Sequence, residues 1–279
     1  MKLIQKISLI LLVGSWIILI SGCEKVVNVD LNETESKVVI EGWIYTTPGP
    51  YKVQLSRTGS YFSSNPAPTI SGALVIIRDN AGNVDTLSET EPGIYSTHTL
   101  QGVSDRTYSL QVTTNGNTYT ATEFLPDVTT IDTLGAISGK DIPFGDKDFY
   151  YVTFYAWEPQ DKKNWYRFIL SKYSTIIGQD SIVNNEPVDW IVTDDGFVKG
   201  DIAELPFITP FEFNDSVTVI MQSLSQPAFD YLAAMQIQVT SDGGMFSPPP
   251  ANPKSNISGG AIGYFGASDV ATKSIRVKP

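Results

Sequence analysis

Short alternating strands separated by turn residues recur along most of this chain, and they restrict its fold more than any other feature. Apolar and polar residues alternate in runs such as VVIEGWIY, LVIIRD and YSLQVTT, with Gly, Pro, Asn or Asp between the runs. Asn115-Gly116 stands between two such runs, and a tight hairpin turn needs a positive φ at both of its central residues. Strands at this spacing predict antiparallel sheets packed as a β-sandwich, so we expect a mainly β protein.

The pattern of the strands changes along the chain and predicts two β-rich domains. Residues 36–126 hold the regular strands and predict a β-sandwich, whereas residues 127–147 contain many turn formers and are predicted to be a linker. Residues 148–279 predict a second β-rich domain. In that domain we expect the aromatic runs 148–159 and 164–173 to pair as a hairpin.

Two further segments of the second domain have their own patterns. After Ser225, which suits a helix cap, apolar residues follow at helical spacing and predict one α-helix over about 226–240. The residues from Ala261 to the end predict a pair of strands. The stretch 178–215 shows no clear periodicity, and long irregular segments are usually functional or mobile.

The beginning of the chain has the pattern of a secretion signal that ends at the only cysteine. Lys2 and Lys6 precede an apolar run that is shorter than a membrane span, and residues 1–22 therefore predict a signal peptide. The sequence Ile-Ser-Gly-Cys that ends at Cys23 is similar to a bacterial lipobox, so we expect lipidation of Cys23. Two or three acyl chains would hold the protein on a membrane, and residues 23–35 would be a tether. The alternatives are an ordinary cleaved signal with an incidental cysteine, or a plain N-terminal anchor.

The charge of the chain excludes one class of partner. The formal net charge is −11, and removal of the leader with Lys2 and Lys6 would make it more negative. Because phosphate backbones repel such a protein, we expect no nucleic-acid partner.

The sequence offers little that could perform catalysis. His98 is the only histidine, so neither a His-rich zinc site nor a typical Ser-His-Asp triad is expected. We expect His98 to be a surface residue. We therefore expect no metal, no cofactor and no enzymatic activity. Two alternatives stay open: a carboxylate pair for hydrolysis, and calcium at the turns 79–83 and 193–196. The candidate carboxylate pairs are Asp194 with Asp195, Asp146 with Asp148, and Glu186 with Asp189.

Aromatic side chains on two strands are the candidate binding residues. One face of the run 148–157 carries Tyr151, Tyr155 and Trp157, and Trp165 and Arg167 share one face of the next run. Rings beside a guanidinium suit stacking on a sugar, a peptide or a partner protein. The alternative is an ordinary aromatic core.

Two resemblances add to this interpretation. The stretch SGALVIIRDNAGNVDTLSETEPGIYSTHTLQGVSDRTYSLQVTTNGNTYTA resembles carboxypeptidase-regulatory-like or prealbumin-like β-sandwiches, which implies an immunoglobulin-like spacer or binding module without an active site. The motifs VVIEGWI, GALVIIRD, NWYRF and SLSQPAFDYLAAMQIQ, in that order after Cys23, resemble the Bacteroidota lipoproteins of the domain-of-unknown-function family 4249. That resemblance implies an outer-membrane lipoprotein associated with a TonB-dependent receptor.

Together these expectations describe a lipid-anchored protein on the periplasmic or cell-surface face of the outer membrane. We expect a non-enzymatic binding or accessory module for a TonB-dependent nutrient receptor. The alternatives are a surface hydrolase of glycan or peptide, and an adhesin or structural spacer.

Overall fold

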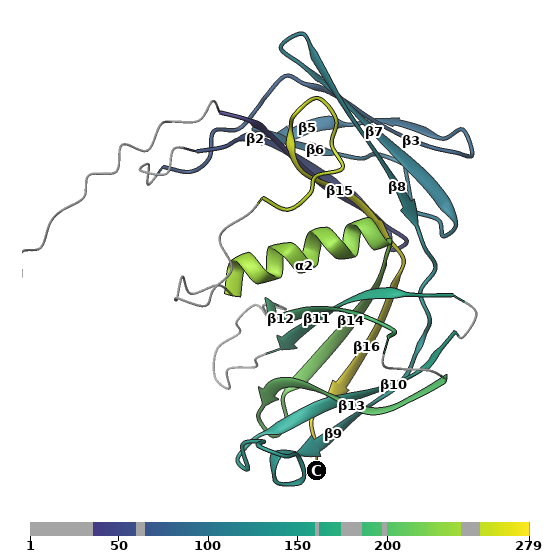
Figure 1. The fold of residues 1–279 in the computed structure, drawn as a ribbon, viewed down its shortest axis with the longest axis vertical. Coiled ribbons are helices and arrows are strands. Elements are labelled where there is room, and N and C mark those ends of the chain that lie inside the picture. The colour runs from purple at the N-terminus through teal and green to yellow at the C-terminus, as the bar shows by residue number, and fades with distance from the viewer. Residues whose placement is uncertain are drawn as a thin grey trace, which may run out of the picture. The chain divides into compact units, whose positions relative to one another are not determined.

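A computed structural model describes residues 36–59, 65–159, 162–173, 186–196, 200–240 and 252–278 of the chain (Figure 1). Within these ranges sixteen strands form four sheets, and one α-helix, α2, spans Gln226–Thr240. The expected mainly β fold with one helix is confirmed. The predicted signal peptide, the tether and Cys23 lie outside the described residues. The described residues all belong to one contact unit, Ser36–Pro279, so the division into two domains stays a prediction.

The first sandwich packs two sheets around one apolar core that includes Ile40, Leu55, Ile77 and Leu110. One sheet has the order β15-β1-β2-β6-β5. Its strands are β1 (Val38–Tyr45), β2 (Lys52–Arg57), β5 (Ser88–Glu91), β6 (Ile94–Ser96) and β15 (Ile262–Ser268). The other sheet has the order β4-β3-β7-β8. Its strands are β3 (Leu74–Asp79), β4 (Val84–Thr86), β7 (Arg106–Thr114) and β8 (Asn117–Leu125).

The predicted hairpin at Asn115-Gly116 is confirmed. Strands β7 and β8 pair antiparallel, with Thr114 opposite Asn117. The two turn residues have φ values of 49° and 77°, the left-handed conformation that a two-residue turn requires.

The expected pairing of the last two strands is wrong. β15 pairs in parallel with β1 in the first sandwich, whereas β16 (Val270–Arg276) pairs with β14 in the second. Two glycines allow β15 to lie against β1: a Cβ at Gly266 would lie 2.3 Å from the Trp43 ring, and one at Gly263 would lie 2.2 Å from the Ile40 carbonyl oxygen. The chain therefore passes from one sandwich to the other at Asp269.

The second sandwich also packs two sheets around one core. The smaller sheet has the order β13-β10-β9, and the larger has the order β12-β11-β14-β16. The additional strands are β9 (Ile131–Ser138), β10 (Tyr150–Glu158), β11 (Trp165–Tyr173), β12 (Glu186–Asp194), β13 (Gly200–Phe211) and β14 (Ser216–Leu224). The predicted hairpin of β10 with β11 is wrong, because the two strands lie in different sheets and face each other through Phe154 and Phe168, whose ring centroids are 4.9 Å apart.

Two segments without a clear sequence pattern contain strands. Residues 127–147, predicted to be a linker, hold β9 and the 3₁₀ turn Gly139–Asp141. The stretch 178–215 holds β12 and β13. The pairing of β13 with β10 is irregular on either side of Thr153, which pairs with Pro206. Prolines and bulges of this kind remove the strict alternation by which a strand is recognised in sequence.

Helix α2 begins as predicted after Ser225, whose hydroxyl accepts a hydrogen bond from the Ala228 amide at 3.2 Å. The helix contacts β11, β12, β14 and β15, and it lies between β15 and the larger sheet of the second sandwich in Figure 1. Ala228 and Leu232 are buried in a cluster with Tyr264 and Leu224.

Candidate functional site

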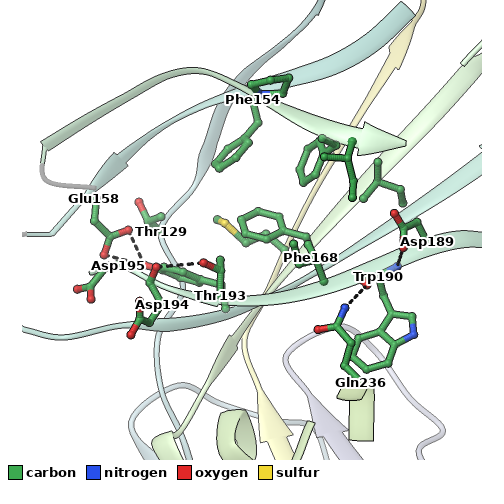
Figure 2. A pocket seen from close by; sticks show the side chains of 17 residues that line it. Thr129, Phe154, Glu158, Phe168, Asp189, Trp190, Thr193, Asp194, Asp195 and Gln236 are labelled. Atoms are coloured by element: carbon green, nitrogen blue, oxygen red, sulfur yellow. Dashed lines mark hydrogen bonds between the residues drawn. The ribbon is translucent and has the colours of Figure 1, made fainter. Parts of the chain in front are cut away.

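A cavity of about 260 Å³ lies between the two sheets of the second sandwich (Figure 2). Its lining comes from β10, β11, β12, β13, β14 and α2. The strand period explains the lining of β10 and β11, since alternate side chains of each strand point toward the facing sheet. The apolar and aromatic lining residues are Phe154, Tyr166, Phe168, Leu170, Trp190, Ile191, Pro206, Phe207, Ile208 and Met221.

Three phenyl rings form the apolar middle of the cavity. The ring centroids of Phe154 and Phe207 are 5.4 Å apart, and those of Phe168 and Phe207 are also 5.4 Å apart. Each of the three side chains is buried. Rings at these separations attract one another, so the contacts among the three rings stabilise the middle of the cavity.

One end of the cavity is formed around a buried carboxyl group. Glu158 is 1% exposed and accepts hydrogen bonds from Asn164 Nδ2 at 2.7 Å and from the Tyr166 hydroxyl at 2.9 Å. Burial raises the pKa of Glu158, the two donors oppose that rise, and the nearby Asp195 adds to it. Figure 2 shows Asp194 and Asp195 at this same end.

The opposite end of the cavity carries another carboxyl group. Asp189 accepts a hydrogen bond from the Trp190 amide at 2.8 Å and a second one from the Thr209 hydroxyl. Gln236 of α2 donates to the Trp190 carbonyl oxygen at 3.2 Å and thereby connects the helix to β12. Figure 2 shows this group on the other side of the rings from Glu158.

The charges that line the cavity are all negative. Glu158, Asp189, Asp194 and Asp195 belong to the lining, and no Lys, Arg or His is among the described residues that form it. Lys163 pairs with Asp194 at 2.9 Å, and its donated hydrogen bond lowers the pKa of Asp194.

The structure separates the five aromatic and basic residues that the sequence singled out. Tyr151, Tyr155 and Trp157 alternate with inward-facing residues of β10 and so lie on the other face of that strand. Trp165 and Arg167 lie on the face of β11 toward α2. None of the five lines the cavity.

Each of the two groups has its own surroundings. Trp157 is 55% exposed, and the Tyr151 hydroxyl accepts a hydrogen bond from the Asp146 amide at 3.1 Å. Trp165 packs in the cluster beneath α2. The Arg167 guanidinium lies 4.9 Å from the centroid of the Trp190 ring, and burial lowers its pKa. A single binding surface made by all five residues is therefore not formed.

The three candidate carboxylate pairs have different outcomes. Asp194 and Asp195 both line the cavity, and Asp189 lines it at the other end. The side chain of Glu186 lies outside the described part of the chain. Asp146 accepts a hydrogen bond from the Asp148 amide at 3.0 Å, so that pair belongs to a turn.

Sequence reasoning missed Glu158, although a signal was present. Val152, Phe154 and Ala156 alternate along β10 and are buried, and Glu158 continues the same face by two residues. A carboxyl group on the buried face of a strand is unusual, because burial of a charge is costly. The two-residue period of the strand alone could therefore have marked Glu158 as a candidate site residue.

His98 is a surface residue, as the sequence indicated, and both of its ring nitrogens also lie within hydrogen-bond distance of a side chain. Its Nδ1 lies 3.0 Å from Asp85 Oδ1, and its Nε2 lies 3.0 Å from Ser88 Oγ. This order is that of a Ser-His-Asp triad. Asp85, however, also accepts hydrogen bonds from the backbone amides of His98, Thr99 and Leu100, which together with the ring lower its pKa to about 2 in spite of burial. These contacts fix the segment after β6 and account for Asp85 as a structural residue.

Turn chemistry also explains the two calcium candidates. Asp79 accepts from the amides of Ala81 and Asn83 at 3.0 and 2.8 Å, and it pairs with Arg106 at 2.8 Å. Asp194 accepts from the Gly196 amide at 3.0 Å. Across the described ranges, no group of three or more His, Cys, Asp or Glu side chains is placed to hold a metal ion. In the same ranges, no helix combines the length and the apolar character that a membrane crossing requires.

The fold and the cavity define a class of protein: a β-rich protein with two sandwiches, one helix that contacts strands of both, and a mostly apolar cavity inside the second. Residues 24–274 match the family described as "Domain of unknown function (DUF4249)", and the chain belongs to that family. A comparison with curated protein sequences finds no significant match.

Proposed function

We propose that this protein is a membrane-attached binding module that takes up a small ligand with an apolar body in the cavity of its second sandwich. The cavity of about 260 Å³ lined by Phe154, Phe168 and Phe207 is the observation that carries the proposal. Binding sites for small molecules are typically concave and mostly apolar, with a few polar groups that fix orientation. The expected sugar or peptide ligand would fit if it presented a ring or an apolar side chain to these rings.

The proposal places the protein beside a partner. Lipidation of Cys23 would hold it at the outer membrane, and a TonB-dependent receptor would be the partner that receives or supplies the ligand. Labelling of cells with radioactive palmitate should mark the wild-type protein and leave Cys23→Ala unlabelled. Affinity purification of the anchored protein should recover an outer-membrane receptor; recovery of the protein alone under conditions that preserve such complexes argues for the adhesin or spacer alternative.

Occlusion of the cavity tests the binding function itself. Ile191 lines the cavity from β12 and is 38% exposed, so Ile191→Trp adds an indole at the cavity with little demand on the core. We expect this variant to lose binding of small naphthyl compounds, measured by equilibrium dialysis with the full chain in phosphatidylcholine nanodiscs. Val84→Trp, at a position 57% exposed on β4, is the matched control and should bind as the wild type does. Equal binding by Ile191→Trp would place the ligand elsewhere.

Hydrolysis is a second candidate function, and one observation favours it. Burial holds the pKa of Glu158 above its ordinary value, as in a general acid, and the Asp195 carboxylate is close enough to contribute to that rise. If this pair hydrolyses a glycan or peptide, Glu158→Gln and Asp195→Asn should each abolish turnover. Absence of turnover by the wild type on a broad panel of both substrate classes leaves binding as the function.

A further inference from the structure

The polar groups of the cavity indicate which charge its ligand carries. Glu158, Asp194 and Asp195 lie at one end of the phenyl rings and Asp189 at the other, and the described lining has no basic side chain (Figure 2). A ligand that brought its own carboxylate into this space would meet like charges at both ends. A ligand with a positive charge would meet opposite charges at both.

The rings add to the same preference. Phe154, Phe168 and Phe207 line the space between the two acidic ends, and the face of a phenyl ring carries negative π density. An organic cation over such a face is attracted to it, and the attraction grows when water is excluded. The carboxyl groups and the rings therefore select for the same kind of ligand.

The neighbouring lysines oppose this field only in part: Lys162 acts to lower the pKa of Glu158, but burial raises it by more. Lys163 pairs with Asp194 and Lys162 with Asp127, and both lysine side chains are largely exposed, at 54% and 41%. Glu158, by contrast, is 1% exposed and accepts hydrogen bonds from the uncharged side chains of Asn164 and Tyr166. Charges that water can reach are screened, whereas those in the cavity act on a bound ligand at short range.

A divalent metal ion does not fit the arrangement. Glu158, Asp194 and Asp195 share one end of the cavity, but no three of the described acidic, histidine or cysteine side chains form a group that could hold a metal. The space between the two ends is apolar and wide enough for rings. An organic body between the acidic ends uses both features.

We propose that the cavity binds organic cations, namely amines with an aromatic or other apolar body, and rejects apolar carboxylates of the same size. This inference rests on the binding function proposed above and specifies its ligand. The ammonium group would lie at the Glu158 end, where Asp195 adds its charge, and the apolar body would lie against the three phenyl rings.

A series of three compounds with one ring system tests the inference. Naphthylethylamine, naphthylethanol and naphthylacetate are nearly equal in size and differ in charge. Their binding to the full chain in phosphatidylcholine nanodiscs can be measured by equilibrium dialysis, with protein-free discs as the blank. We expect the amine to bind at least about tenfold more tightly than the acetate, with the alcohol between them.

Two variants locate the preference. Glu158→Gln keeps the size and an acceptor for Asn164 and Tyr166 but removes the charge, and it should reduce the ratio of amine to acetate affinity at least about threefold. Glu91→Gln removes one charge from exposed β5 outside the cavity and should leave the ratio unchanged. Retained affinity of Glu158→Gln for the neutral alcohol shows that this variant is folded.

The outcomes separate the two proposals. An acetate that binds as tightly as the amine, or a ratio that is unaffected by Glu158→Gln, overturns the inference about charge while Ile191→Trp still tests the binding function. If none of the three compounds binds, or if Ile191→Trp binds them all as the wild type does, the binding function fails and the inference fails with it.

Discussion

Asp269 connects the two sandwiches, and its removal should be among the most destabilising single changes in the described part of the chain. Its carboxylate accepts from the Thr46 hydroxyl at 2.6 Å, the Ser104 hydroxyl at 3.0 Å, the Val128 amide at 3.1 Å and the Val270 amide at 2.8 Å. Thr46 and Ser104 belong to the first sandwich, and Val128 and Val270 lead into strands of the second. One side chain therefore holds four segments at the point where the chain passes from β15 to β16.

The magnitude follows from what Asp269→Ala leaves behind. A hydrogen bond to a charged group contributes about 1.5–3 kcal/mol, and an unsatisfied buried donor costs about 1–3 kcal/mol. Two of the four donors are backbone amides that cannot turn away; the Val270 amide can still donate to the Thr46 hydroxyl at 3.2 Å, whereas the Val128 amide loses this acceptor. The two hydroxyl groups can find water. We therefore expect Asp269→Ala to lower the free energy of unfolding by about 3–5 kcal/mol, and Asp269→Asn, which keeps one acceptor oxygen, by about 2 kcal/mol.

Urea unfolding of the full chain, followed by tryptophan fluorescence, measures the loss. Asp132→Ala, on an exposed position of β9, is the matched control and should change the free energy by less than about 0.5 kcal/mol. Losses below about 1 kcal/mol for both Asp269 variants would refute the assigned role.

The same carboxylate gives a dependence on pH. Four accepted hydrogen bonds, opposed by burial, lower the pKa of Asp269 below its ordinary value. A group with a lowered pKa in the folded state stabilises the fold above its unfolded pKa and loses that contribution as pH falls through the folded pKa. The difference in stability between the wild type and Asp269→Asn should therefore be constant near neutral pH and shrink below about pH 4.

The remaining predictions concern the first sandwich. Asp85→Asn should lower the free energy of unfolding by about 2 kcal/mol at neutral pH, because the folded pKa of Asp85 is about 2 against an ordinary value of 3.8. This loss should vanish as the pH falls toward the folded pKa. A loss that stays the same between pH 7 and the folded pKa would contradict the assignment. Gly266→Ala would place a Cβ 2.3 Å from the Trp43 ring and should cost about 1–3 kcal/mol in a urea titration, whereas Gly82→Ala, with open space around its Cβ, should show only the strain of its positive φ. A fluorophosphonate probe should not label Ser88, since the Asp85 carboxylate is occupied by hydrogen bonds from backbone amides. If the probe labels the wild type and not Ser88→Ala, Ser88 is instead a working nucleophile.

Local patterns predicted the elements that depend on local chemistry. The hairpin at Asn115-Gly116 follows from two residues that accept a positive φ, and α2 follows from the cap at Ser225 and the apolar spacing behind it. The mainly β class follows from the same kind of argument. In each case the residues that decide the structure are neighbours in sequence.

Pairings between distant segments could not be predicted in the same way. β15 pairs with β1, which lies more than two hundred residues earlier, because Gly263 and Gly266 permit a close approach of the two strands. A glycine in the sequence does not reveal which distant segment will pack against it. β10 and β11 are consecutive aromatic strands that look like a hairpin, yet their inward rings pack face to face from two sheets. The cavity could not be predicted for the same reason. The five candidate binding residues, whose role stays a prediction, lie outside it, and its lining depends on which faces the two sheets turn toward each other.

A crystal structure of the protein with naphthylethylamine tests the central claim most directly. We predict the naphthyl rings in the cavity against Phe154, Phe168 and Phe207, with the amine nitrogen within hydrogen-bond distance of Glu158. An empty cavity in crystals that hold the amine at another place, or an amine directed away from all four carboxyl groups, would contradict the account.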